Sequence, residues 1–235
     1  MLPSWKKGAS PAHVSVELTL VRHGQSTANR DGILQGRHDA LLSELGHQQA
    51  AQLGAWFRER GMTWHAAYCS PLQRARDTAR IVLAESGPPL VEDRDLEEVH
   101  VGEMQGKTSV ELRSQHGSFY TRGIEALGDY SEFGGEAYEE VQIRVNRFIA
   151  GLHERHRGHE HRVLVVSHGG LLFQLAKALV CQPVPRVVML RFSNCSATRV
   201  RLRERRGTYI GEVEWHLPIE LLGGEPSGGS AALLY

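Results

Sequence analysis

The chain has 235 residues, enough for one large domain or two small ones. Its 27 Lys and Arg residues balance its 27 Asp and Glu residues, which disfavours binding to nucleic acid or to a membrane surface, because such proteins usually carry a basic excess. The three cysteines, Cys69, Cys181 and Cys195, are widely spaced, so they predict no disulfide framework and favour reduced thiols in a cytoplasmic protein.

Both ends of the chain are expected to be flexible. Residues 1–13 lack hydrophobic periodicity and contain no apolar segment typical of a signal peptide. Residues 223–235 are rich in Gly, Ser and Pro. The longest apolar stretch, Leu171 to Cys181, is interrupted by polar residues and is too short to span a bilayer. We therefore expect no membrane association and one domain over residues 14–222.

Helix and strand signals alternate in the first half of the chain. Ser43 is a typical helix cap, and Ser70-Pro71-Leu72-Gln73 is typical of a helix start with Ser70 as the cap. Gly24 permits a sharp turn after the first strand. The predicted elements are a strand over 16–21, a polar loop over 25–42, a helix over 43–60, a strand over 64–69 and a helix from 70 to about 85.

The second half continues the alternation. Thr108 and Glu111 form a capping pattern, and the fully apolar residues 163–166 are typical of a strand buried in a parallel sheet. The predicted elements are a strand over 90–96, a short helix over 108–116, a long helix from about 136, a strand over 163–166, a helix ending near 180, a strand over 187–192, and a hairpin of strands 198–203 and 208–215.

This order of elements predicts an α/β fold. Strands that alternate with helices favour a three-layer sandwich in which a mostly parallel central sheet has helices on both faces. The C-terminal hairpin would add an antiparallel edge. His153, His156, His159 and His161 lie after the long helix, and we interpret this tract as a solvated loop rather than a metal site.

Two predicted strands end in a histidine. Arg22 and His23 follow the first strand, and His168 follows the strand over 163–166. Because open α/β sheets bind ligands at the carboxyl ends of their strands, these side chains can meet over one crevice. Arg74, in the first turns of a helix, would add a second guanidinium suited to phosphate oxygens. Taken singly, each residue is better explained as a polar strand end, a surface arginine or a structural histidine.

The chain resembles the histidine phosphatase superfamily, also called the phosphoglycerate-mutase-like family. Four motifs of that family occur in order and span residues 16 to about 200. They are Arg22-His23-Gly24-Gln25-Ser26; Ser70-Pro71-Leu72-Gln73-Arg74-Ala75 with Thr78-Ala79; the acidic motif of Leu96, Glu98, Gly102 and Gly106; and Ser167-His168-Gly169-Gly170. Asn194 begins a late segment that is also similar to the family's phosphatases.

The resemblance implies a role for each matching residue. His23 would attack phosphorus and carry a covalent phosphohistidine, and Glu98, rather than its neighbours Glu97 and Glu103, would be the general acid and base. The residues implied to hold the phosphoryl group are Arg22, Arg74 and His168, with Asn29, Gln35 and Gly169 as further substrate contacts. This cationic set would replace a metal, so neither a metal nor a cofactor is expected.

A phosphatase is favoured over a mutase. The family's mutases have an Arg just after the acidic Glu and a Tyr two residues later, where this chain has Val99 and Val101. They also have an adjacent Arg pair in the later insertion, where only Arg122 is present. Alternatives left open are phosphoglycerate-mutase-type phosphoryl transfer, a non-catalytic phosphate-binding module and a protein-histidine phosphatase.

The expected substrate is a small phosphorylated metabolite. The insertion at about 107–138, with its aromatic residues and few cations, would cover the pocket as a lid. Such a lid suits a substrate with an apolar or sugar-like part better than one with a second phosphate. The resemblance makes a homodimer one option. No sequence feature decides the oligomeric state.

Overall fold

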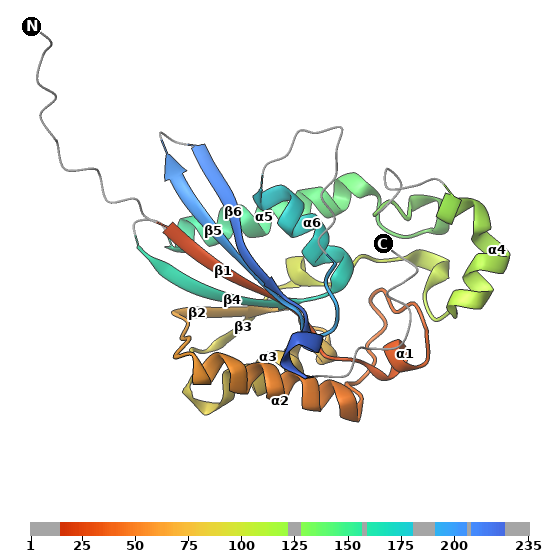
Figure 1. The fold of residues 1–235 in the computed structure, drawn as a ribbon. Coiled ribbons are helices and arrows are strands. Elements are labelled where there is room, and N and C mark those ends of the chain that lie inside the picture. The colour runs from red at the N-terminus through yellow and green to blue at the C-terminus, as the bar shows by residue number, and fades with distance from the viewer. Residues whose placement is uncertain (1–14, 122–127, 157–158, 181–190, 206–207, 224–235) are drawn as a thin grey trace, which may run out of the picture.

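The computed structural model describes residues 15–121, 128–156, 159–180, 191–205 and 208–223 (Figure 1). The predicted leader over 1–13 and nearly all of the predicted tail lie outside these residues. No described helix is long and apolar enough to cross a bilayer.

One six-stranded mixed sheet forms the centre of the protein. Its strands are β1 (Ser15–Arg22), β2 (Ala66–Cys69), β3 (Leu90–Glu92), β4 (His161–Ser167), β5 (Ala197–Arg205) and β6 (Thr208–Leu217). The strand order is β3-β2-β4-β1-β5-β6. The pairs β2–β3, β2–β4 and β1–β4 are parallel, whereas β1–β5 and β5–β6 are antiparallel. The predicted mostly parallel sheet with an antiparallel hairpin at its edge is therefore confirmed.

Helices cover both faces of the sheet, as the three-layer prediction requires (Figure 1). The helices α2 and α3 lie on one face, and α5 and α6 lie on the other; α4 projects to one side and α1 is a single short turn. Their bounds are α1 (Thr27–Arg30), α2 (Glu44–Glu59), α3 (Gln73–Leu83), α4 (Ser109–Thr121), α5 (Tyr138–His156) and α6 (Gly169–Leu179).

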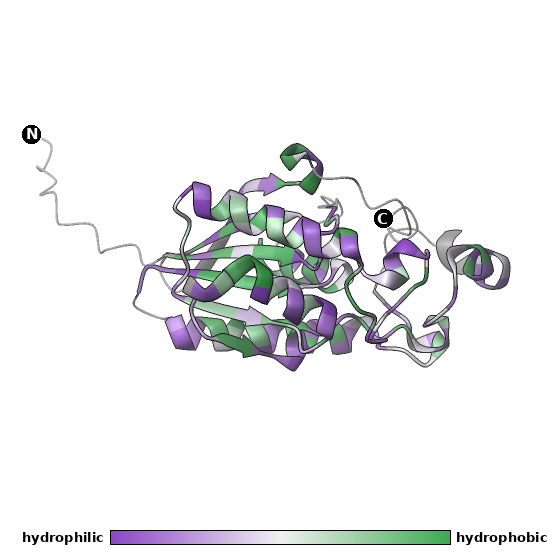
Figure 2. Ribbon diagram, turned by 90° about the horizontal axis from the view of Figure 1, so that it is seen from below, coloured by the Kyte–Doolittle hydropathy of each residue, from purple (hydrophilic) through white to green (hydrophobic). Residues whose placement is uncertain are grey.

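The alternation of side chains along β4 explains the two cores. Val163 and Val165 pack with Phe148 of α5 in one buried cluster, whereas Leu164 and Val166 pack with Leu53 of α2 in the other. Successive residues of a strand point to opposite faces, so a strand that is apolar throughout must be covered on both sides. Figure 2 shows the apolar strands between the more polar outer surfaces of the helices.

The start of α3 differs from the prediction. The helix begins at Gln73, and Ser70 does not cap it; the carboxylate Oδ1 of Asp39 instead accepts a 2.7 Å hydrogen bond from the N–H of Gln73. Ser70 is fully buried beneath the helix start, and its hydroxyl is used by His168, as described below. At α2, by contrast, Ser43 is the predicted cap and accepts a hydrogen bond from the N–H of Gly46 at 3.1 Å.

Three further element predictions need correction. The predicted strand over 90–96 ends at Glu92, and residues 94–96 form a 3₁₀ turn. The capping contacts of Thr108 with Glu111 are present, but α4 continues past a kink at His116 to Thr121. Of the predicted strand over 187–192, residues 187–190 lie outside the described residues and the last two residues are not in a strand.

The histidine tract is only in part the solvated loop that was predicted: His159 is exposed outside the helices and strands, whereas His153 and His156 belong to α5 and His161 begins β4. His156 is buried at the end of α5, where its Nε2 pairs with the Tyr68 hydroxyl at 3.1 Å and its Nδ1 lies 2.8 Å from Nδ1 of His161. Burial first, and then His161, lower the pKa of His156 to about 4. Apolar packing of the last turn of α5 onto β2 buries this ring. Among the described residues, no group of three His, Cys, Asp or Glu side chains is placed to hold a metal ion.

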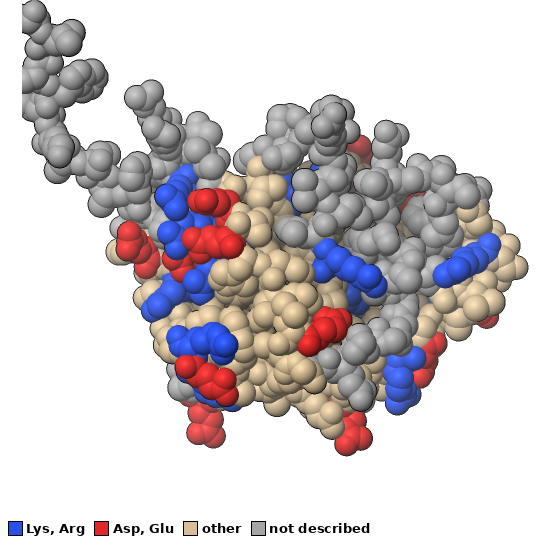
Figure 3. All heavy atoms as spheres, in the orientation of Figure 1, with Lys and Arg blue, Asp and Glu red and all other residues tan. Residues whose placement is uncertain are grey.

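Charged side chains of both signs are mixed on the surface. On the face drawn in Figure 3, Lys and Arg side chains lie beside Asp and Glu side chains, and the described residues form no extended basic region there. This distribution matches the balanced composition of the chain.

Candidate active site

The site lies at the carboxyl ends of β1 and β4, which are neighbours in the sheet. Arg22 is paired with Ser167 in the parallel register, and the N–H of His23 donates to the carbonyl of Ser167 at 2.9 Å. The residues after the two strands are therefore brought together. The rings of His23 and His168 lie with centroids 5.0 Å apart, so the predicted meeting of the two strand-end histidines is confirmed.

Glycine occupies position 24 for a different reason from the one predicted. Its φ angle is not in the positive range, so the turn itself does not demand glycine. A Cβ atom at this position would collide with the carbonyl of Gly46 in α2. The missing side chain therefore lets the first turn of α2 approach the strand end that carries His23.

His23 is held as a neutral imidazole with one nitrogen presented for reaction. Its ring is 2% exposed, and Nδ1 lies 2.7 Å from the carbonyl of Gly24. A carbonyl only accepts hydrogen bonds, so Nδ1 carries the hydrogen and Nε2 keeps its lone pair. Burial, then Arg74 and Arg22, hold the pKa of His23 well below its usual value. This imidazole is therefore nucleophilic at neutral pH.

Arg74 is buried beside His23 without a carboxylate partner among the described residues. Its Nη1 and Nη2 donate to the carbonyls of His38 and Gly36, both at 2.8 Å, and its Nε donates to the lone pair of His23 Nε2 at 3.3 Å. Burial lowers the pKa of Arg74 to about 10. At neutral pH the guanidinium is thus charged and oriented by carbonyl dipoles, which leaves its charge to attract an anion.

His168 contributes a buried nitrogen that has no partner. The ring is fully buried; its Nε2 pairs with the Ser70 hydroxyl at 2.8 Å, and its Nδ1 has no hydrogen-bond partner. Ser70 Oγ also accepts from the N–H of Leu72 at 3.2 Å. Buried polar groups are rarely left unpaired, although His168 is not among the residues that line the pocket.

Ser70 is therefore a site residue that the sequence did not reveal. Its pattern matched a local helix cap, and nothing in the sequence spacing indicates that its hydroxyl turns instead toward a histidine from β4. Only the parallel pairing of β2 with β4 brings Ser70 and His168 together.

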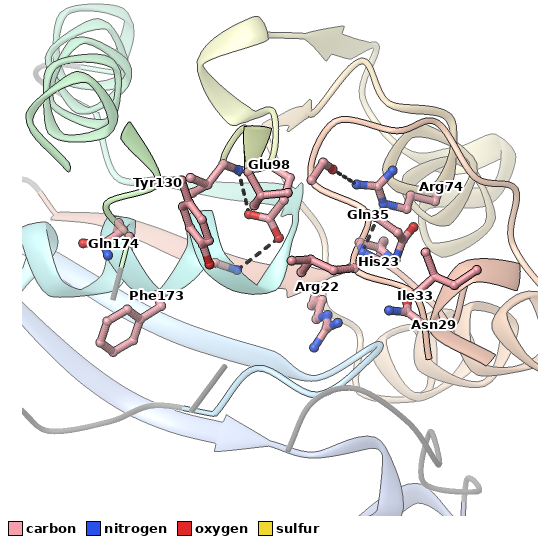
Figure 4. A pocket seen from close by; sticks show the side chains of 16 residues that line it. Arg22, His23, Asn29, Ile33, Gln35, Arg74, Glu98, Tyr130, Phe173 and Gln174 are labelled. Carbon is pink, nitrogen blue, oxygen red and sulfur yellow. Dashed lines mark hydrogen bonds between the residues drawn. The ribbon is translucent and has the colours of Figure 1, made fainter. Parts of the chain in front are cut away.

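Glu98 reaches the site from the segment after the 3₁₀ turn. Figure 4 shows its carboxylate between Tyr130 on one side and Arg22 with His23 on the other. Its Oε1 accepts from the N–H groups of Val99 and Leu171, both at 2.9 Å, and its Oε2 accepts from Gly170 at 3.2 Å. The first turn of α6 thus orients the carboxylate toward the pocket.

The two competing carboxylates lie elsewhere. Glu97 pairs with Arg37 at 3.2 Å, and Glu103 is exposed in a separate 3₁₀ turn. Of these three predicted candidates for the general acid, Glu98 is the one that lines the pocket.

The polar loop after β1 supplies two amides to the pocket wall. Asn29 and Gln35 line the pocket, and the Ser26 hydroxyl donates to Oε1 of Gln35 at 2.9 Å. Asn194 does not line the pocket; its Nδ2 donates to the carbonyl of His23 at 2.9 Å and to Oδ1 of Asn29 at 3.2 Å. Asn194 therefore fixes the backbone of His23 and the orientation of Asn29.

The glycines at the start of α6 have different positions. Gly170 lines the pocket, whereas Gly169, predicted as a substrate contact, does not. A Cβ on Gly169 would lie 3.3 Å from Cζ of Arg22, so this glycine allows the helix to pack against the guanidinium. Arg22 itself donates from Nη1 to the carbonyl of Phe192 at 2.6 Å.

Arg22, His23 and Arg74 line one end of the pocket, called the phosphate end below. Beyond it, the pocket wall is largely apolar. The space within the pocket, about 690 Å³, includes the part that opens to solvent. Arg22 and Arg74 are the only Lys or Arg residues among the described lining residues. The apolar wall consists of Ile33, Leu34, Val99, Val101, Tyr130 and Phe173, and Gln174 adds an amide.

The geometry combines the parts that phosphoryl transfer needs. A neutral imidazole with a presented lone pair supplies a nucleophile. The guanidinium groups of Arg22 and Arg74 supply donors for oxygens that gain charge in the transition state. A carboxyl group within the same pocket can supply a proton to a leaving oxygen.

Comparisons with known proteins agree on the family. The model of the histidine phosphatase superfamily (branch 1) matches residues 18–212. A metal-independent phosphoserine phosphatase of Arabidopsis thaliana is 30% identical over 206 residues, which cover 86% of this chain and 83% of the relative. A probable phosphoglycerate mutase of Salmonella paratyphi A is 30% identical over 198 residues, covering 84% of this chain and 90% of the relative.

A solved structure gives the same result. The mycobacterial glucosyl-3-phosphoglycerate phosphatase, studied as a complex with VO3, superimposes with a TM-score of 0.70 at 26% identity and covers 85% of this chain and 97% of its own. The family model alone spans most of the chain, and the resemblance inferred from the four motifs is confirmed. The chain belongs to the histidine phosphatase superfamily, branch 1.

Proposed function

We propose that this protein hydrolyses phosphate monoesters of small metabolites through a covalent phosphohistidine on Nε2 of His23. The observation that carries the proposal is the hydrogen bond from His23 Nδ1 to the Gly24 carbonyl at 2.7 Å. It fixes the tautomer and leaves Nε2 as the nucleophile, beside Arg74 at 3.3 Å.

The reaction proceeds in two balanced steps. Nε2 of His23 attacks phosphorus as the bond to the ester oxygen breaks, and Glu98 gives its proton to that oxygen, so the alcohol leaves neutral. Glu98, now a carboxylate, takes a proton from water as the water oxygen attacks the phosphohistidine. The P–N bond breaks, inorganic phosphate is released, and His23 is again neutral. Arg22, Arg74 and His168 hold the phosphoryl oxygens throughout.

The lining of the pocket favours hydrolysis over mutase transfer. Val99 and Val101 both line the pocket, at the positions where the family's mutases have an Arg and a Tyr. A mutase needs polar contacts to a second acid group of its substrate, and these two valines offer none. Net mutase turnover that exceeds phosphate release would overturn this choice.

We also propose that the alcohol part of the substrate carries no charge. Arg22 and Arg74 are the only cations among the described lining residues, and both belong to the phosphate end. The remaining wall is apolar apart from amides and the Tyr130 hydroxyl. Gly128 and Tyr130, which line the pocket, support the segment 107–138 as its lid.

The proposal is tested by phosphate release from para-nitrophenyl phosphate in EDTA. Wild-type enzyme should turn over without added metal, and His23→Ala should show neither turnover nor acid-labile phosphohistidine after a quench. His47→Ala is the matched control, because this exposed histidine of α2 pairs with the carbonyl of Ser43 at the helix cap and should retain activity. Equal activity of the His23 variant and wild type would disprove the mechanism.

Assembly and location complete the proposal. Cys69 and Cys195 are buried free thiols, and burial raises the pKa of Cys69 to about 12, which suits a reduced, unreactive thiol. We place the protein in the cytoplasm on this basis, and fractionation of expressing cells tests it. A homodimer remains the option to test by light scattering.

A further inference from the structure

Glu136 is the centre of a buried ion-pair network beside the site. Its Oε1 accepts from Arg37 Nη2 and from Arg144 Nε, both at 2.9 Å. Its Oε2 accepts from Arg144 Nη2 at 3.0 Å and from the N–H of His100 at 2.8 Å. The side chains of Glu136 and Arg144 are 13% and 7% exposed, so both carboxylate oxygens are committed to partners away from solvent.

The network holds the backbone on both sides of Glu98. Arg144 Nη1 donates to the carbonyls of Asp95 and Glu97 at 2.8 and 2.7 Å. Arg37 Nε donates to the carbonyl of Glu98 itself at 3.2 Å. Together with the N–H of His100, which Glu136 accepts, the backbone is fixed before, at and after the residue that carries the carboxyl group.

The same network reaches the phosphate end of the pocket through Arg37. The carbonyls of its two neighbours, Gly36 and His38, are the ones that orient the Arg74 guanidinium. Its side chain, meanwhile, binds Glu136 and the backbone of Glu98. One short segment thus sets the position of a phosphate-binding cation and of the carboxyl group relative to each other.

From these contacts we infer that Glu136 is a positioning residue for Glu98: through Arg37 and Arg144 it fixes the distance between the proton donor and the ester oxygen of a substrate held at Arg74. The inference rests on the proposed function. Glu136 touches neither the pocket nor the reacting atoms, since it does not line the pocket, and it acts only through the segment that it holds.

The chemistry of the leaving group separates this role from ordinary structural support. An alkyl alcohol leaves as a strongly basic alkoxide and needs a proton from Glu98, whereas para-nitrophenolate leaves without one. A displaced proton donor therefore slows alkyl esters selectively. Damage to His23 or to the phosphate-binding arginines slows both kinds of ester alike.

The experiment compares phenethyl phosphate with para-nitrophenyl phosphate in Glu136→Gln. Glutamine keeps the shape but replaces one accepting oxygen with an NH₂ group, which opposes the donors that face it. Glu98 also activates water in the second step, so the comparison uses kcat/KM, which reports only the steps up to formation of the phosphohistidine. We expect kcat/KM for the alkyl ester to fall about 100-fold, the loss that a displacement near 1 Å can cause, while kcat/KM for the aryl ester stays within about threefold. In a Glu98→Gln background, the added Glu136→Gln change should have little further effect on the alkyl ester.

Glu17→Gln is the matched control. Glu17 is also a carboxylate held by two arginines, Arg199 and Arg201, with a side chain 20% exposed, but it lies on β1 among the strands. Its loss should leave the ratio of alkyl to aryl rates unchanged. If Glu136→Gln does not fold, Arg37→Met tests the same contact between Glu136 and the backbone of Glu98. The native Arg37 side chain is 33% exposed. This variant should change the ratio of alkyl to aryl rates in the same direction.

The possible results separate failure of the positioning role from failure of the proposed function. Equal losses on both esters, or an unchanged ratio in a folded variant, overturn the positioning role while leaving the phosphatase activity intact. Wild-type enzyme that hydrolyses neither ester overturns the proposed function, and the positioning role falls with it.

Discussion

Replacing Ser70 with alanine tests how the site orients His168. The Ser70 hydroxyl and Nε2 of His168 are 2.8 Å apart, and both side chains are fully buried. Because Nδ1 of the same ring has no partner, Ser70→Ala leaves the imidazole with no hydrogen bond. An unsatisfied buried group costs about 1–3 kcal/mol. If that energy is lost in the transition state, kcat/KM should fall roughly 5- to 150-fold, since about 1.4 kcal/mol is a factor of ten.

The assay is kcat/KM for para-nitrophenyl phosphate in a double-mutant cycle with His168→Ala. Once the imidazole is gone, Ser70→Ala should change kcat/KM by less than about threefold. Ser43→Ala is the control for helix-start stability: it removes a cap worth about 1 kcal/mol and should leave kcat/KM nearly unchanged. If Ser70→Ala has the same effect with and without the His168 ring, the hydrogen bond does not orient it and the reasoning is refuted.

Three further predictions follow from the site and from the histidine tract. Glu98→Gln should lower kcat/KM for alkyl phosphates by about 10²- to 10⁴-fold and for para-nitrophenyl phosphate far less; equal losses of kcat/KM would reject it as the acid. Because the pKa of His23 lies well below 6.5, the nucleophile stays neutral as pH falls, and kcat/KM corrected for substrate ionisation should show no acid limb near 6.5. The pKa of His156, lowered from 6.5 to about 4, means that the unfolded chain takes up a proton in this range while the folded protein does not. This histidine alone should therefore contribute a stability loss of about 1–2 kcal/mol between neutral pH and about pH 5. Other buried histidines add their own losses, so the drop measured by urea unfolding should be smaller in His156→Gln than in wild type by about this amount, not absent.

The sequence predicted the parts of the site that depend on the order of strands and helices. His23 and His168 were expected to meet because each follows an apolar strand, and the carboxyl ends of parallel strands meet at one edge of a sheet. Arg74 was expected from its place near a helix start. The alternation of strands with helices along the chain was sufficient to predict the layers, because helices that connect parallel strands cover the two faces of the sheet.

The sequence could not predict contacts between residues that are far apart in the chain, because neither helix nor strand periodicity relates such residues. The Ser70 pattern was interpreted as a cap, and the tertiary contact with His168 overrides it. Arg37 and Glu136 are 99 residues apart, and each alone is typical of an exposed polar segment. His156 was expected in solvent, because its neighbours in the sequence are polar, although the helical spacing of α5 turns it toward the sheet.

The arginines of this protein differ in what balances their charge. Arg144 pairs with the carboxylate of Glu136, and Arg37 pairs with those of Glu136 and Glu97, which makes them supports for the backbone. Arg74 is held by carbonyl oxygens instead, which orient a guanidinium without cancelling its charge. A carboxylate in place of those carbonyls would compete with the phosphate dianion for the same donors. Burying such a cation is costly, and that cost appears as the pKa of Arg74 lowered to about 10. Binding of a dianion relieves it, so the site is preorganised for the charge that phosphoryl transfer brings.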